Sequence, residues 1–258
     1  LPANSITLTA TATDKDGDGA SQVANLGAGF VFKDDAPTVT ATANTAPTLT
    51  VDETTLATNA SASFASLFSV AYGADGAGST AYKLGVANAT TGLIDTATGE
   101  AIVLSVDASG NVVGKTATSG ATVFTVSVDA NGVVTLDQAR AIKHSDPANG
   151  DEPISLPANS ITLTATATDK DGDSASQVAN LGAGFVFKDD APTVTMTAVS
   201  GNTVTVDESS AGTTTNGVFA TAISSTSANA VVNTTVNYGA DGAGTTVYGL
   251  TAVTGVTA

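Results

Sequence analysis

The chain of 258 residues contains no cysteine and no tryptophan, and only 5% of its residues are aromatic. The absence of cysteine excludes disulfide bonds, zinc–thiolate sites and cysteine nucleophiles together. The absence of tryptophan and the scarcity of tyrosine argue against an aromatic platform on which sugars stack. A single histidine, His144, and a single arginine, Arg140, lie near no plausible acid–base partner, so the sequence predicts that the chain is not an enzyme.

Basic residues are also few, and the net charge is −16. Nucleic acids and anionic membrane surfaces are bound by clustered Lys and Arg, so neither is an expected partner. No run of apolar residues approaches the eighteen that a membrane-spanning helix needs, and no direct membrane contact is expected. Metal cations are the natural partners of so acidic a chain, and no small-molecule substrate is expected.

Alanine, valine and threonine dominate the remaining composition, which predicts pleated strands with thin cores and an all-β fold. Alternating apolar and polar residues predict a series of short strands. The expected strands are 5–12, 29–33, 38–43, 48–51, 101–106, 111–115, 122–128 and 133–136. Glycine-containing turns at 107–110 and 129–132 predict hairpins, and 137–144 is interpreted as a short helix. Many short strands between such turns favour a β-sandwich.

Residues 1–43 recur at 156–198 with only two changes, at Gly19/Ser174 and Ala41/Met196. The offset of 155 residues is too long for one coil of a β-solenoid, and near-identity favours a tandem spacer over a single catalytic centre. The motif Tyr-Gly-Ala-Asp-Gly-Ala-Gly at 72–78 recurs at 238–244, an offset of 166. We therefore expect an eleven-residue insertion after Glu208 that forms a surface loop.

Acidic residues are concentrated in two duplicated sets of seven. Carboxylates at positions 1, 3 and 5 of Asp14-Lys15-Asp16-Gly17-Asp18 have the spacing with which an EF-hand loop begins to wrap Ca²⁺, although position 12 is Asn25 instead of Glu. An Asp-Asp pair precedes Ala-Pro, and a Val-Asp-Glu motif follows. The candidate calcium ligands are Asp14, Asp16, Asp18, Asp34, Asp35, Asp52 and Glu53 at the first junction, and Asp169, Asp171, Asp173, Asp189, Asp190, Asp207 and Glu208 at the second.

The Asp-Asp-Ala-Pro segments resemble the calcium-binding linkers of cadherins. Together with Tyr-Gly-Ala-Asp-Gly-Ala-Gly, Val-Thr-Leu-Asp-Gln-Ala-Arg-Ala-Ile and Thr-Ala-Thr-Asp-Lys-Asp-Gly-Asp, they resemble the extender repeats of giant RTX adhesins, type I-secreted biofilm proteins of Gram-negative bacteria. The resemblance implies tandem immunoglobulin-like β-sandwich domains joined by calcium-binding linkers, on the extracellular side of the cell surface. The implied domains are the end of a preceding repeat (1–35), a complete extender repeat (36–190) and the start of a following repeat (191–258).

A carbohydrate- or ice-binding β-sandwich is the competing function, since stretches such as 7–9 and 38–40 alternate threonine as ice-binding faces do. Asp75 and Asp241 lie in glycine-rich turns and are interpreted as turn residues, although each could add a calcium ligand. The segment from His144 to Asp146 is interpreted as a surface loop with an exposed histidine. Whether the period of 155 residues holds one sandwich or two is not decided by the pattern.

Overall fold

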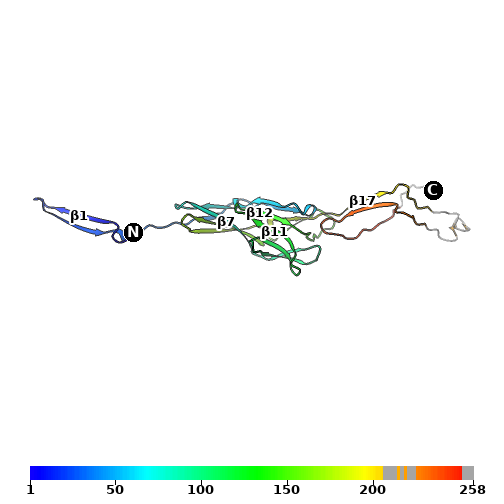
Figure 1. Ribbon diagram of the computed structural model, residues 1–258, viewed down its shortest axis with the longest axis horizontal. Coiled ribbons are helices and arrows are strands. Elements are labelled where there is room, and N and C mark those ends of the chain that lie inside the picture. Colours follow the sequence, from blue (N-terminus) through cyan, green and yellow to red (C-terminus); the bar gives the residue numbers. More distant parts are fainter. Residues whose placement is uncertain (206–213, 216–217, 220–224, 252–258) are drawn as a thin grey trace.

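The computed structural model describes residues 1–205, 214–215, 218–219 and 225–251. Three regions follow one another along an elongated molecule: an N-terminal hairpin, a central body and a C-terminal region (Figure 1). Within the described residues the secondary structure is β-strand with four short 3₁₀ turns, which confirms the all-β prediction. In the described part of the chain, no helix is long and apolar enough to cross a membrane.

The N-terminal hairpin consists of β1 (Thr7–Thr13) and β2 (Gly19–Asn25), followed by the 3₁₀ turn η1 (Gly27–Gly29). All residues of both strands are exposed. The hairpin extends away from the body, with its Asp-rich turn at the far end (Figure 1). The strand predicted at 29–33 does not form here, whereas its second copy forms β16.

The central body contains a six-stranded antiparallel sheet in the order β5-β12-β11-β10-β9-β8. Its strands are β5 (Ala60–Ser63), β8 (Thr90–Ile94), β9 (Ala101–Val106), β10 (Val112–Thr116), β11 (Thr122–Val128) and β12 (Val133–Gln138). The predicted hairpin turns are confirmed: Gly110 and Gly132 have positive φ angles of 85° and 75°, which glycine adopts without steric cost. In each turn the preceding aspartate, Asp107 or Asp129, accepts backbone N–H bonds.

Three smaller sheets complete the body. The first has the order β15-β14-β7, the second β13-β16-β4, and the third pairs β3 with β6. Their strands are β3 (Thr38–Ala41), β4 (Leu49–Asp52), β6 (Phe68–Ala71), β7 (Ala77–Val86), β13 (Pro153–Ser155), β14 (Ile161–Asp169), β15 (Ser174–Asn180) and β16 (Phe185–Lys188). The pairing of β16 with β4 is parallel, and the others are antiparallel.

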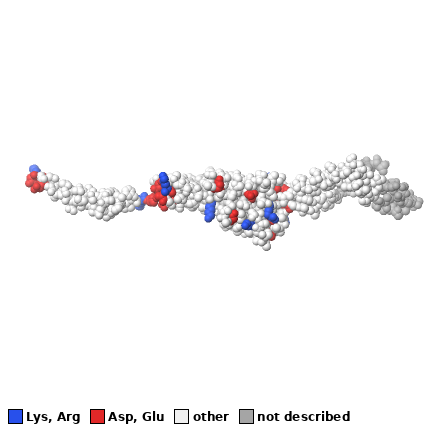
Figure 2. Space-filling view, in the orientation of Figure 1, with Lys and Arg blue, Asp and Glu red and all other residues white. Residues whose placement is uncertain are grey.

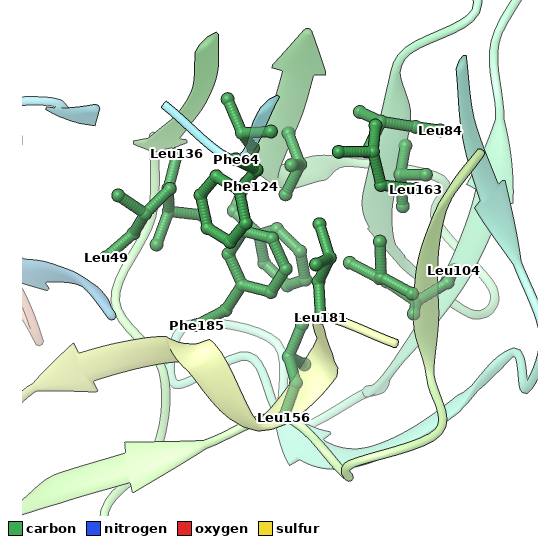
Figure 3. Close-up of a cluster of buried hydrophobic side chains, with 14 of the residues drawn as sticks. Leu49, Phe64, Leu84, Leu104, Phe124, Leu136, Leu156, Leu163, Leu181 and Phe185 are labelled. Atoms are coloured by element: carbon green, nitrogen blue, oxygen red, sulfur yellow. The ribbon is translucent and has the colours of Figure 1, made fainter. Parts of the chain in front are cut away.

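One contiguous hydrophobic core lies between these sheets (Figure 3). Strand β14 shows how the sequence produces it, because its residues alternate strictly between buried and half-buried positions. Phe124 of β11 and Phe187 of β16 pack with their ring centroids 4.9 Å apart, and both side chains are fully buried. The shared core joins the six-stranded sheet to the smaller sheets, as the β-sandwich prediction requires.

The predicted helix at 137–144 is wrong. Strand β12 continues to Gln138, and the chain then bends at Arg140 without forming a helix and makes an isolated bridge between Ile142 and Asp95. The polar groups of this segment are directed to partners elsewhere in the chain, which a helix would not allow. The Arg140 guanidinium forms two hydrogen bonds with the buried carboxylate of Asp95, at 2.7 and 2.9 Å, so the single arginine stabilises the fold.

The C-terminal region pairs β17 (Thr193–Ala198) with β20 (Val232–Asn237), the counterparts of β3 and β6. A second short pairing joins β18 (Thr214–Thr215) to β19 (Val218–Phe219). The predicted insertion after Glu208 falls largely outside the described residues. The domain boundaries at 35/36 and 190/191 stay predictions.

Candidate metal centres

The structure brings carboxylates together at both ends of the central body. At the N-terminal end, Asp34, Asp75 and Asp171 offer ligand atoms within 4.8 Å of one another, and Asp171 also belongs to a second such set with Asp169 and Asp173. We call these five residues the N-terminal junction group. The acidic side chains gathered where the body begins are visible in Figure 2. Carboxylate oxygens in this number are the ligands that Ca²⁺ takes in proteins.

A tight turn holds the neighbouring linker residue Asp35. Its Oδ2 accepts the backbone N–H of Ala74 at 3.1 Å. Gly73 has a φ of +75°, and a Cβ atom there would collide with the Asp35 carboxylate. The glycine of the Tyr-Gly-Ala-Asp motif is therefore needed both for its backbone conformation and for close approach of the linker. This explains why the motif accompanies the Asp-Asp linker in the sequence.

Two carboxylate oxygens of the N-terminal junction group, Asp75 Oδ2 and Asp169 Oδ2, are buried and have no hydrogen-bond partner in the part of the chain that the structure describes. Burial raises the pKa of Asp75, and the neighbouring carboxylates of Asp171, Asp35 and Asp34 raise it further. Acids crowded in this way repel one another unless a proton or a cation neutralises them. The group fits a divalent cation on these grounds.

At the C-terminal end, Glu53, Asp189, Asp190 and Asp241 form a second set of ligand atoms within 4.8 Å, which we call the C-terminal junction group. The geometry repeats that of the first junction. Asp190 Oδ2 accepts the N–H of Ala240 at 3.0 Å, and a Cβ at Gly239 would collide with the Asp190 carboxylate. The two junctions are thus built by the same linker-to-turn contact.

Glu53 is the most buried member of the C-terminal junction group, at 2% exposure. Its Oε1 accepts the Gln138 side-chain amide at 2.9 Å and the Ile142 N–H at 2.8 Å. Its Oε2 has no hydrogen-bond partner within the described ranges. Burial raises the pKa of Glu53 to about 8 despite these hydrogen bonds, and burial also raises the pKa of Asp189. A bound cation would relieve both effects by stabilising the ionised forms.

The grouping differs from the one expected from sequence order. Asp14, Asp16 and Asp18 were assigned to the same junction as Asp34 and Asp35, but they form a set of their own at the free end of the N-terminal hairpin. The seven residues of β2 rise about 3.3 Å each, which separates this turn from the open end of the hairpin by roughly 20 Å. The second copy of the loop, at 169–173, accordingly meets the linker that precedes its own unit, where Asp34 lies. It does not meet the linker that follows its unit, where Asp189 and Asp190 lie.

Asp52 also lies outside the junction groups. Its Oδ1 accepts the backbone N–H of Thr54 at 2.9 Å and so caps the turn η2 (Glu53–Thr55). The hydrogen bond to Thr54 lowers the pKa of Asp52. Asp52 is therefore a turn cap in this structure. Asp207 and Glu208, the counterparts of Asp52 and Glu53, lie outside the described residues.

Three residues of these centres were not assigned as ligands from the sequence. Asp75 and Asp241 were interpreted as turn residues, and the repeated Tyr-Gly-Ala-Asp motif was the signal that marked them. His144 was expected to be exposed, which is wrong: only 3% of its side chain is accessible, and it lies beside Glu53. The loop after it closes through Glu152, whose carboxylate accepts the backbone N–H groups of Ser145 and Asp146.

The fold and these two junction groups define an all-β protein with acidic centres at the ends of its body. Residues 48–182 match the family described as a domain of unknown function, DUF5801, and because the match covers more than half of the chain, the chain belongs to this family. No curated protein and no solved structure matches the chain.

Proposed function

We propose that this chain is a structural extender segment of a bacterial surface adhesin, in which calcium ions at the junctions hold successive units in line. The observation that carries the proposal is the repeated linker contact. At each end of the body, an Asp-Asp linker binds the turn of the following unit through one carboxylate, and further carboxylates converge beside it.

Electrostatic repulsion among the junction carboxylates favours a bound cation. Like charges within about 5 Å disfavour the ionised state of each carboxylate, and buried oxygens without partners lose their hydration. A Ca²⁺ ion coordinated by residues of both units would replace a flexible hinge by a fixed geometry. The N-terminal junction group supplies such residues from the linker (Asp34), from the β6–β7 turn (Asp75) and from the β14–β15 loop (Asp171).

Calcium would also stabilise the fold by mass action. At about 1–10 mM free Ca²⁺ and a dissociation constant near 10⁻⁴ M, binding to the folded state adds ~1.4–2.7 kcal/mol per site. The resemblance to RTX adhesin extenders supports an extracellular location, where calcium reaches these concentrations. The duplicated sequence supports a mechanical role, because identical units face equivalent neighbours along a tandem array.

The proposal is tested by calorimetric titration of Ca²⁺ into protein first treated with EDTA, together with melting curves. We expect several sites with micromolar to millimolar affinity and a melting temperature that rises with calcium. Mg²⁺ should substitute poorly, because it requires a tighter octahedral shell and gives up its water reluctantly. The absence of both binding heat and a calcium-dependent melting shift would overturn the proposal.

A further inference from the structure

His144 is the only histidine of the chain, and its environment is unusual. Among the described residues, neither buried ring nitrogen has a hydrogen-bond partner, and nor does the buried Oε2 of the adjacent Glu53. The exposed fractions of the two side chains are 3% and 0%. Buried polar atoms are almost always paired, because an unpaired buried group loses its hydration without compensation. The unpartnered atoms of His144 and Glu53 indicate that a group able to bind one imidazole nitrogen and a carboxylate oxygen belongs at this position.

The geometry suits a metal ion better than a proton. Nε2 of His144 lies 3.6 Å from Oε1 of Glu53, which is too long for a hydrogen bond. Ligands bound to one ion at about 2.0–2.2 Å lie roughly 3–3.5 Å apart, close to this separation. Asp189 completes the arrangement, since ligand atoms of Glu53, His144 and Asp189 all lie within 4.8 Å of one another.

We propose that Glu53, His144 and Asp189 form a site for a borderline divalent transition metal, of which Zn²⁺ is the representative. Imidazole nitrogen is a preferred ligand of Zn²⁺, Ni²⁺ and Cu²⁺, whereas Ca²⁺ takes oxygen ligands. One histidine and two carboxylates leave a coordination position for water. An open hollow of about 380 Å³, lined in part by His144, Asp189 and Asp241, gives the ion and its water access from solvent.

The site shares Glu53 and Asp189 with the C-terminal junction group, so a transition metal would compete with calcium for these two carboxylates. The N-terminal junction group contains only aspartates and offers no nitrogen ligand. The two ends of the body should therefore differ in metal preference, although their linker contacts are the same. This inference does not depend on calcium binding or on the adhesin assignment.

The test uses the whole chain, treated with EDTA and dialysed, with Zn²⁺ added at neutral pH. Because the chain has one histidine, the imidazole NMR signals belong to His144 without further assignment. We expect Zn²⁺ to shift these signals at a stoichiometry of one ion per chain, and calorimetry to show a matching site. His144→Gln should weaken that site at least 10-fold, whereas Asp137→Asn, at an exposed position of β12, should leave it unchanged.

Two results would overturn the inference: imidazole signals that do not move with Zn²⁺, or a His144→Gln variant that binds Zn²⁺ as tightly as the wild type. The first result needs no variant, so a folding defect of His144→Gln cannot obscure it. If the protein binds calcium but Zn²⁺ does not shift the imidazole signals, the zinc site is refuted and the proposed function stands. Imidazole signals that shift with Zn²⁺, in a protein that binds no calcium, would refute the proposed function and leave the zinc site standing.

Discussion

The N-terminal hairpin and its second copy in the body have the same sequence except at Gly19/Ser174, and they pair in the same register. Even a side-chain contact is repeated, since Thr11 with Ser21 and Thr166 with Ser176 both lie at 2.8 Å. Their surroundings differ completely. Leu8 is 59% exposed, whereas its counterpart Leu163 is fully buried. The local pattern therefore determines the hairpin, and the rest of the unit determines whether it has a core.

The segment after each hairpin makes the same point more strongly. Phe187 is fully buried in β16, which pairs with β13 and β4, whereas Phe32 is 79% exposed in a segment without strand pairing. An apolar strand needs partners for its backbone N–H and C=O groups as well as for its side chains. The sequence Phe-Val-Phe-Lys becomes a strand only where both are supplied.

Amide hydrogen exchange should show the largest difference between the two copies. Amides of β14 pair on both sides, with β15 and β7, and they should exchange only through large-scale unfolding. Those of β1 pair with β2 alone. We expect protection factors in β14 at least ~10³ higher than at the matching residues of β1, measured by mass spectrometry or NMR. Equal protection would show that the N-terminal hairpin is covered in solution.

Matched core substitutions should separate the copies in stability. Leu163→Ala removes a fully buried side chain opposite Leu84 of β7, and we expect a loss of about 2–5 kcal/mol in the free energy of unfolding of the body. Leu8→Ala, the same change in the exposed copy, should alter the stability by less than about 0.5 kcal/mol. Urea denaturation followed by circular dichroism measures both. Similar losses for the two variants would contradict the description of the first copy as unpacked.

The two regions should also respond differently to pH. Glu53 in the body has its pKa raised to about 8 by burial, so the folded state holds this proton more tightly than the unfolded state, whose pKa is near 4.5. The contribution of this proton to the free energy of unfolding is fully present below about pH 4.5 and is lost as the pH rises towards 8. The loss is on the order of 2 kcal/mol or more. In EDTA the wild type should therefore lose stability between pH 5 and 8, and Glu53→Gln should lose less.

Asp14 in the exposed loop supplies the control for this pH measurement. A hydrogen bond with Asp16 and the backbone N–H of Asp18 lower the pKa of Asp14 below its ordinary value, away from the pH range of the measurement. Asp14→Asn should leave the change in stability between pH 5 and 8 as it is in the wild type. A Glu53→Gln variant with the full pH dependence of the wild type would show that Glu53 is already ionised in the folded protein.

The smallest expected difference concerns calcium affinity. Asp16 and Asp171 occupy the same position in the two copies of the loop, but only Asp171 lies within reach of Asp34 and Asp75. Asp171→Asn should weaken one of the tighter calcium sites about 10-fold in a calorimetric titration, since additional carboxylates raise affinity. Asp16→Asn should change only a site of millimolar affinity. Equal effects of the two substitutions on calcium affinity would show that the loop carboxylates bind calcium alone, without the linker aspartates.

Much of this architecture could be predicted from residue patterns. The strands at 101–106 and 122–128 have the predicted bounds, and the turns at 107–110 and 129–132 are as expected, because period-two alternation and glycine turns are local signals. Long-range pairing is not encoded locally. The parallel contact between β4 and β16 joins residues more than 130 positions apart. The failed helix at 137–144 has the same cause, since its partners are distant in the sequence: Glu53 lies in the turn η2, and Asp95 directly follows β8.

The sequence predicted which aspartates take part in the candidate centres more successfully than which of them lie together. The linker aspartates do meet other carboxylates, but sequence order paired the loop at 14–18 with the wrong junction, because the length and direction of a hairpin decide which end its turn reaches. Asp75, Asp241 and His144 could not be ranked as ligands from their neighbours in the chain. Their role depends on which backbone approaches them, and the approach of Asp35 to Gly73 is a tertiary contact.

Small-angle X-ray scattering tests the central claim, that cations at the junction carboxylates hold the units in line. Wild type, the double variant Asp189→Asn/Asp190→Asn and the control Asp16→Asn/Asp18→Asn are compared in millimolar calcium, with EDTA-treated wild type as the flexible reference. Asparagine keeps the size and one oxygen ligand, so the N–H of Ala240 retains an acceptor while two charges are lost. We predict that the linker variant, which changes only the C-terminal junction, has a maximum dimension between those of wild type in calcium and wild type in EDTA. It should retain its β-rich circular dichroism, and the control should stay as extended as wild type. If wild type is as long in EDTA as in calcium and the linker variant does not shorten, protein contacts alone hold the junctions and the account is wrong.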